Sequence, residues 1–561
     1  MIRLTTLALL LLLVPIVLSL GASGPPAASG PPAASGPPAD LGATLRRIDP
    51  ERIRTDLKFL ADDLLEGRGT GQRGGRLAAL YLETRFRQIG LAPGASETGY
   101  LQDVPLVGVD SGEDSRLEFR AKDQTLRPER LVDFVGNSET QQEVTEIEAP
   151  LVFAGYGIVA PEQRWDDFKG ADLKGKLLVL LVNDPPSEDP SFFGGKALTY
   201  YGRWTYKFES AARAGARGAI LIHTDASAGY GWSVVRNSWG RERPYMALRP
   251  GGAAPLALAS WVSESFGRRM LQAAGQDFDS LRESASRRDF RPLPLGISLA
   301  ARLTSRVRPI STWNVIGRIP GSDPRLAREA VVFTAHYDHL GVGTPEEGDA
   351  IYNGAADNAS GVSALLETAR LFTSLPRPPR RTLLFLAVGA EEGGLRGSEY
   401  YVRHPVVPLE RTAAALNMDG LPVDGAPRDY TFLGSDRTTL REVVRDASAV
   451  LDFEVIPDPH PDQGSFFRSD QFNFAKAGVP SMSIDPGVNY KGKPAGWGEQ
   501  AWKEYEEKRY HRPTDAYDES FDLSGMRDVV RIALYAGWRL AETEGKPAWN
   551  PGDEFAPTRR P

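Results

Sequence analysis

Two adjacent glutamates follow an apolar run in the segment Thr382–Gly397, which reads TLLFLAVGAEEGGLRG. The run from Leu383 to Val388 is apolar on both faces, which predicts a central strand of a parallel sheet. The glycines after it allow a sharp turn, so Glu391 and Glu392 are expected at the carboxyl end of that strand, where open α/β sheets place their sites. An acidic turn without a function would look the same, so the interpretation depends on the residues around it.

Side chains that could bind a metal precede this segment. His336 and Asp338 lie two residues apart near the end of a predicted strand, Ala330–Asp338, and therefore share a face of it. That spacing suits an imidazole ligand whose ring is oriented by a carboxylate. His339 falls on the other face of the strand and is predicted to be a bystander.

Three further residues could complete such a site. Asp357 stands in a loop of small residues, NGAADNASG, where nothing bulky prevents close approach. Asp419 ends another apolar strand, AAALNMD, and His511 lies in RYHRPTDAYD. Each has a structural explanation when taken alone. Two imidazoles and three carboxylates together exceed the needs of one catalytic zinc and match two metals if one carboxylate bridges them: His336, Asp357, Glu392, Asp419 and His511.

These segments resemble, in the same order, the motifs of the M28 family of metallopeptidases, which includes aminopeptidases and glutamate carboxypeptidase-like enzymes with two zinc ions. The matching segments are AHYDH, NGAADNASG, AEEGGLRGS, NMDG and YHRPTD, together with SDQFNFAKAGVPSMSI. The resemblance covers about Thr312 to Glu544. It implies an α/β fold of the zinc exopeptidase, phosphorylase/hydrolase-like type, with a mostly parallel mixed sheet flanked by helices.

The resemblance also implies which residues hold the metals. One metal would be bound by His336 and Asp419, the other by Glu392 and His511, and Asp357 would bridge the two. The implied cofactors are two Zn²⁺, although Co²⁺ or Mn²⁺ would also suit oxygen and imidazole ligands. The bridging segment departs from the family pattern, since it reads Ala-Asp-Asn where many members have Asp-Asp-Asn.

Three residues receive catalytic roles from the same resemblance. Glu391 would be the general base that takes a proton from metal-activated water and passes it to the leaving amine. Asp338 would lie behind His336, and Tyr510 would help to stabilise the tetrahedral intermediate. The predicted function is therefore hydrolysis of peptide bonds at the amino terminus of peptides.

Other functions stay open. A carboxypeptidase resembling glutamate carboxypeptidase II would need arginines for a substrate carboxylate, and composition offers Arg236, Arg241, Arg243 and Arg249. A glutaminyl cyclase-like enzyme would use one zinc. A non-catalytic binding relative would keep the fold and lose ligands, whereas every residue with an implied role is present in this chain.

The elements that would position these residues alternate between strand and helix from Thr312 onward, which implies a largely parallel sheet covered on both faces. Two helices are predicted earlier, at about Asp49–Leu64 and Gly74–Ile89. A separate β-rich module is predicted from about Leu101 to Leu303. It resembles the protease-associated (PA) domain inserted in several family members. A lid over the cleft is a hypothesis for its role, and its His223 is expected to be structural.

The beginning of the chain has the layout of a secretory signal. Arg3 precedes an apolar run, Leu4–Leu18, and small residues follow, which predicts export to the periplasm or beyond with cleavage near Ala22. An uncleaved anchor is the alternative, because the run is close to the minimum that spans a bilayer. The sequence ASGPPA, repeated three times, predicts an extended tether that buries no core.

Composition excludes several classes of partner and site. A net charge of -7 without a sustained basic run gives no support to nucleic-acid binding. Because the chain has no cysteine, it can have no disulfide, thiolate nucleophile or lipidated cysteine. Peptide substrates are the expected partners, with no stable membrane insertion after signal cleavage, and the oligomeric state stays open. The predicted division is signal peptide 1–22, linker 23–40, first part of the peptidase domain 41–125, PA-like module 126–303, catalytic domain 304–545 and tail 546–561.

Overall fold

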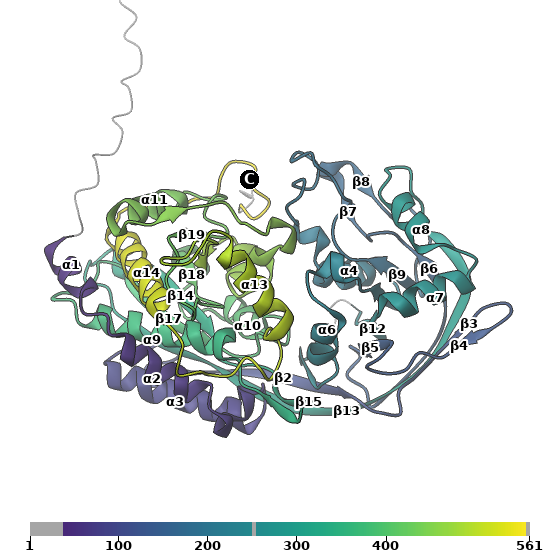
Figure 1. Cartoon of the computed structure of the whole chain (residues 1–561), viewed down its shortest axis with the longest axis horizontal. Coiled ribbons are helices and arrows are strands. Elements are labelled where there is room, and N and C mark those ends of the chain that lie inside the picture. The colour runs from purple at the N-terminus through teal and green to yellow at the C-terminus, as the bar shows by residue number, and fades with distance from the viewer. Residues whose placement is uncertain (1–37, 250–253, 557–561) are drawn as a thin grey trace, which may run out of the picture.

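The computed structural model describes residues 38–249 and 254–556 (Figure 1). The predicted signal peptide and nearly all of the predicted linker lie outside the described residues. Two regions stand side by side in the structure, and one long strand, β13 (Leu293–Ile319), runs along both of them.

The first region contains a mixed sheet whose central strands are parallel. Their order is β21, β18, β14 and β17, with bounds Ser481–Ser483, Thr412–Asn417, Ala330–His336 and Thr382–Val388. All residues of β14 and β17 are buried, as the apolar runs predict for strands covered on both faces. The last part of β13 pairs with β17 in the antiparallel direction, and β2 (Leu101–Ser111) and β1 (Ala92–Pro93) pair with β13.

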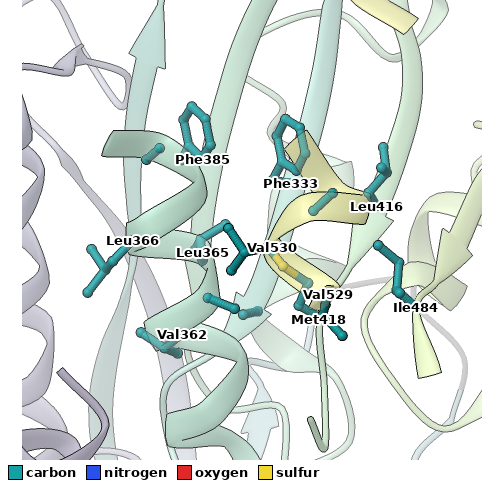
Figure 2. Packing of buried hydrophobic residues seen from close by; sticks show 14 of the residues in the cluster. Phe333, Val362, Leu365, Leu366, Phe385, Leu416, Met418, Ile484, Val529 and Val530 are labelled. Atoms are coloured by element: carbon teal, nitrogen blue, oxygen red, sulfur yellow. The ribbon is translucent and has the colours of Figure 1, made fainter. Parts of the chain in front are cut away.

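Alternate residues of the central strands contact different helices. Phe333 and Phe385 stack with ring centroids 5.1 Å apart on the face that packs against α9 and α14 (Figure 2). Val332 and Leu384 belong to the cluster on the opposite face, with residues of α10 and α12. The helices around this sheet are α2 (Pro50–Leu60), α3 (Arg73–Ile89), α9 (Ser360–Thr373), α10 (Arg396–Arg403), α11 (Leu440–Leu451), α12 (Gln471–Lys476), α13 (Trp497–Lys508) and α14 (Ser524–Glu542).

Local sequence explains several of these boundaries. Asp49 accepts a hydrogen bond from the Glu51 amide at the start of α2, and Pro50 is the first helical residue. Gly90 ends α3 in the left-handed conformation with φ 87°, which a residue without a Cβ adopts at little cost. The predicted ends of these two helices therefore differ little from the observed ones, except that α2 stops before Leu64.

The second region has its own parallel strands in the order β6, β9, β10 and β12, and an antiparallel edge strand, β5. Their bounds are Val144–Phe153, Leu177–Leu181, Gly218–Ile222, Leu258–Val262 and Phe134–Asn137. β9, β10 and β12 are buried throughout, so both of their faces need a cover. Helices cover these strands, so the region contains more helix than the predicted β-rich module. The helices are α4 (Trp204–Arg213), α6 (Trp232–Trp239), α7 (Glu264–Ala273) and α8 (Phe278–Ala285).

The two regions share β13. Its first half pairs with β6 and β3 (Arg116–Arg120), and its second half pairs with β2 and β17. The strand passes without a break through residues 303 and 304, where the sequence predicts a domain boundary. Among the described residues, no helix has the length and apolar character needed to cross a membrane.

Candidate metal centre

The central parallel strands end where the predicted chemistry begins. His336 is the last residue of β14, Glu391 and Glu392 follow β17 after a short turn, and Asp419 follows β18. The turn after β17 is tight because Gly397, at the start of α10, lies against the backbone of Gly389, where an added Cβ would come within 2.2 Å of the carbonyl oxygen.

His336 contacts two carboxylates. Its Nε2 lies 3.1 Å from Asp419 Oδ1 and 3.2 Å from Asp357 Oδ1. Its Nδ1 lies 3.1 Å from the backbone carbonyl of Asp338, and because a carbonyl can only accept, Nδ1 carries the donated proton. The Nε2 lone pair is thus free to face a cation. Ser469 donates to the other oxygen of Asp419 at 2.6 Å.

Glu392 contacts two other imidazoles. Its Oε1 lies 2.7 Å from His339 Nδ1 and its Oε2 lies 3.1 Å from His511 Nε2. Asp357 Oδ2 lies 3.4 Å from the same His511 nitrogen, whereas Asp357 Oδ1 faces His336. The two oxygens of Asp357 therefore point at different imidazoles, which is the arrangement that a bridging carboxylate requires.

His339 does not lie away from the site, as its predicted position on the other face of the strand would require. Strand alternation places it on the opposite face from His336, but β14 ends at His336, so the alternation no longer applies three residues later. His339 is buried beside Glu392 and Asp357. We refer below to the ligand cluster, which consists of His336, His339, Asp357, Glu392, Asp419 and His511.

The ligand cluster has donor atoms that fit divalent metal ions. One ligand atom from each residue lies within 4.8 Å of the others in two groups, one with His336, Asp357 and Asp419 and one with His339, Asp357 and Glu392. Both ring nitrogens of His339 and Oε1 of Glu392 are buried and make no hydrogen bond with the described residues. Imidazole nitrogen and carboxylate oxygen are the ligands of catalytic zinc sites.

Charge in the ligand cluster favours bound cations as well. Burial lowers the pKa of His511, but Glu392 and Asp357 outweigh it and raise that pKa to about 10. Burial acts to raise the pKa of Glu392, but the charge of His511 holds it below its ordinary value. The carboxylates thus draw protons onto the imidazoles, and metal ions would supply the same positive charge.

Glu391 and Asp338 lie directly beside the ligand cluster. The backbone amide of Glu391 donates to Asp338 Oδ1 at 3.0 Å, and Thr70 donates to Asp338 Oδ2 at 3.1 Å. Asp338 Oδ1 lies 3.9 Å from His336 Nδ1, so the carbonyl of Asp338, and not its carboxylate, orients that ring. Burial raises the pKa of the Glu391 carboxyl well above its ordinary value. That shift suits a group that accepts and returns a proton.

The Asp357 loop is held by a buried aspartate that the sequence does not single out as functional. Asp515 accepts from the backbone amides of Ala356 and Asp357, at 3.1 and 3.0 Å. Arg509 donates to the same carboxylate at 3.0 Å. Ala356, the residue that departs from the family pattern, is therefore fixed through its backbone and needs no carboxylate.

The second region also contacts the ligand cluster. Ser238, in α6, has its Oγ 2.8 Å from His511 Nδ1. The neighbouring Asn237 donates to the His511 backbone carbonyl at 3.2 Å and to Glu346 at 2.9 Å. Nothing in the local sequence of α6 marks these residues as partners of the site. Tyr510 stacks on His511 with ring centroids 4.0 Å apart.

A cavity of about 960 Å³ lies between the two regions and contains the candidate site. His336, Asp357, Glu391, Glu392 and Tyr510 line it, together with Trp204 and Trp239 of the second region. Of the four arginines offered by composition, Arg243 lines this cavity, stacked 4.4 Å from the Trp239 ring. Arg236 instead pairs with Glu346, Arg241 packs over the Tyr352 ring, and Arg249 is exposed.

Comparisons with known proteins agree with this arrangement. Residues 314–537 match Peptidase family M28. The chain is 29% identical over 250 residues to leupeptin-inactivating enzyme 1 of Streptomyces exfoliatus, covering 44% of this chain and 52% of that protein. It is 31% identical over 225 residues to aminopeptidase YwaD of Bacillus subtilis, covering 39% and 43%. The alignments thus span about half the length of these curated relatives.

The fold is similar to a solved structure as well. An aminopeptidase from Aneurinibacillus sp. strain AM-1 matches with a TM-score of 0.54 over 91% of this chain and 98% of that chain. The identity is 20%, so this likeness concerns the fold. The mixed sheet, the candidate metal centre at its carboxyl edge and the matched residues support one conclusion. Residues 314–537 of this chain are therefore identified as a domain that matches Peptidase family M28.

Proposed function

We propose that this chain is an exported metallopeptidase that uses two zinc ions to hydrolyse peptide bonds at the amino termini of peptides. The observation that carries the proposal is the position of Asp357. Its two oxygens face His336 and His511 separately, and Glu391 lies beside them on the same cavity. The names of the aminopeptidase relatives support the same reaction.

The residues that would hold the metals are those of the ligand cluster. His336 and Asp419 would hold one ion, Glu392 and His511 the other, and Asp357 both. His339 lies close enough to Glu392 to take part in the second site. When bound, such ions would supply an acidified water and a polarised substrate carbonyl. Cobalt or manganese would suit the same ligands, so the choice of zinc rests on the donor set.

The protein's own residues would move the proton and hold the substrate. Glu391 would accept a proton from the attacking water and return it to the leaving amine, and its buried position favours the protonated form in between. Asp338 fixes the backbone of Glu391 and would keep its carboxylate aimed at the cavity. Tyr510 lines the same cavity and would donate to the oxygen that becomes negative in the transition state.

The other parts of the proposal concern location and the second region. Export depends on the predicted signal segment 1–22, and the division at 126–303 and 304–545 remains a proposal about the chain's modules. The second region would act as a cover for the site, since Trp204, Trp239 and Arg243 line the same cavity as Glu391.

One experiment tests the reaction. The purified protein would be assayed with short peptides whose amino termini are free or acetylated, before and after chelation and again after zinc is returned. We expect cleavage only of peptides with free amino termini, its loss with the chelator and its recovery with zinc. Metal-dependent release from the carboxyl end of acetylated peptides would instead establish a carboxypeptidase. Absence of turnover with bound metal would favour a glutaminyl cyclase-like or binding protein.

A further inference from the structure

One carboxylate on the cavity lies outside the ligand cluster and has no positive partner. Asp485 lines the cavity that contains the candidate metal centre, and its Oδ2 is buried without a hydrogen bond to the described residues. Burial, and then the negative charge of Asp419, raise the pKa of the Asp485 carboxyl to about 8, and Asp458 adds a further negative charge. A cationic group bound beside Asp485 would offset both the burial and the repulsion.

The register of the sheet places Asp485 next to Asp419. β18 and β21 are parallel neighbours, with Asn417 opposite Ser483. The amide of Ile484 then donates to the Asn417 carbonyl at 3.2 Å, which continues the ladder by one residue. Asp419 and Asp485 each stand two positions past the paired residues Asn417 and Ser483. Asp485 therefore occupies beyond β21 the position that Asp419 occupies beyond β18.

The distance from the metal centre decides which group of a substrate could reach Asp485. The ligand cluster is centred on the end of β14, because Asp419 follows the strand on one side of it and Glu392 follows the strand on the other. Asp485 follows β21, the second strand from β14, which corresponds to about 10 Å at the usual strand spacing. The α-ammonium of a peptide lies only two bonds from the carbonyl carbon that the metals would hold. A lysine ammonium lies six bonds from that carbon, so it matches the distance to Asp485 better.

The cavity near Asp485 also has an apolar wall. Leu433 lines the cavity beside β21, since its carbonyl accepts from the Ser483 amide at 3.1 Å. Leu433 and Phe467 belong to one apolar cluster, and Phe467 lines the same cavity. Long cationic side chains cover apolar surface with their hydrocarbon stems while the charged end contacts a polar group. An apolar wall together with a carboxylate is the combination that such a side chain requires.

We propose that Asp485 binds the cationic side chain of the first residue of the substrate, so that peptides beginning with lysine or arginine are preferred. The proposal rests on the peptidase function proposed above. Both side chains would donate charge-assisted hydrogen bonds to the carboxylate, which are stronger than hydrogen bonds between neutral groups. An uncharged side chain of the same length would fill the cavity and leave Asp485 without a partner.

The test compares first residues that differ in charge but hardly in length. Lysine is paired with norleucine and arginine with citrulline, each followed by Ala-Ala and each with a free amino terminus. For the wild type we expect kcat/KM to be at least about tenfold higher for the charged member of each pair. In D485N we expect kcat/KM to fall at least about tenfold for the charged peptides and to change less than twofold for the uncharged ones. D485E should keep much of the preference, because it keeps the charge.

E209Q is the matched control. Glu209 lines the same cavity, but its side chain is 41% exposed and pairs with Lys476 at 3.4 Å. We expect E209Q to change kcat/KM by less than twofold for all four peptides. The melting temperature of D485N should not fall, because the amide keeps the shape of a carboxyl group whose charged form is disfavoured by burial.

Two outcomes of the kinetic test would overturn the proposal. Equal losses for charged and uncharged peptides in D485N would assign Asp485 to the α-ammonium that all four peptides share, or to the fold. An unchanged preference in D485N, or no preference in the wild type, would show that Asp485 does not select the first side chain.

A binding measurement separates this role from the reaction. Titration calorimetry of the lysine and norleucine peptides with zinc-loaded E391Q and E391Q/D485N measures affinity without turnover. At least tenfold weaker binding of the lysine peptide alone to the double variant would support the proposal even if the wild-type protein cleaved none of the peptides. Cleavage by the wild type together with equal affinities of the two variants would retain the peptidase and reject the role of Asp485.

Discussion

Ser238 Oγ lies 2.8 Å from Nδ1 of His511, so the second region contacts the imidazole whose Nε2 faces Glu392 and Asp357. If Nε2 holds a metal, Nδ1 carries the proton and donates to the serine hydroxyl. The second region would then help to orient a metal ligand as well as cover the site.

We therefore expect Ser238→Ala to weaken metal binding. Loss of a group that orients a ligand typically lowers metal affinity about 10-fold to 100-fold. Competition with a fluorescent chelator measures this directly, and only the binding step that involves His511 should respond. Ser233→Ala, on the same helix but hydrogen-bonded to Arg512, is the control and should keep wild-type affinity. Unchanged affinity in Ser238→Ala would mean that the second region does not support the metal site.

Glu391→Gln should lower kcat by about 100-fold to 10,000-fold with little change in KM, because the amide cannot accept a proton. Metal content by elemental analysis should stay at the wild-type level, since Glu391 belongs to neither group of candidate ligands. Glu399→Gln is a suitable control, because that carboxylate also lines the cavity but pairs with Arg396 and Arg403. Full turnover in Glu391→Gln would assign the base to another residue.

Asp515→Ala should destabilise the protein. The change removes the acceptor of two buried backbone amides and leaves Arg509 without its partner, at a cost of about 3 kcal/mol. Urea unfolding measures the loss of stability, and metal affinity should fall too, because the Asp357 loop loses its support. Asp518→Ala, on the exposed surface nearby, should change the unfolding free energy by less than about 0.5 kcal/mol. Similar effects of the two substitutions would contradict this role of Asp515.

Acid sensitivity should depend in part on Asp323. This residue precedes β14, whereas the site residues follow the carboxyl ends of β14 and its neighbours. The amides of Leu326 and Arg325 and the guanidinium of Arg380 donate to its carboxylate, and these hydrogen bonds lower the pKa of Asp323 in the folded state. A lowered folded pKa contributes stability above the unfolded value, and that contribution is lost as pH falls through the folded pKa.

The measurement is the difference in urea midpoint between pH 7 and pH 3 for wild type and Asp323→Asn. We expect the variant to be less stable at pH 7 and to lose less stability on acidification. Parallel pH profiles for the two proteins would show that the aspartate makes no such contribution. Asp289→Asn provides the control, since that carboxylate has only a 3.4 Å contact with Arg287.

Local sequence predicts the parts of the fold that depend on local chemistry. The apolar run before Glu391 predicts β17, because a strand covered on both faces needs apolar residues at every position. The ends of α3 follow from its helical pattern and from Gly90. The helices of the second region are less evident, since α6 combines buried positions with the polar residues that contact the metal centre.

The candidate ligands and the order of the central strands and helices along the chain can be predicted from the sequence, because residue type and apolar periodicity are local properties. The place of His339 depends on the tertiary fold, since strand alternation ends with β14, and so does the contact of Ser238 with His511. Ser238 and His511 are 273 positions apart in the chain. Packing of the two regions brings such residues together, and no local pattern records which distant side chains will meet.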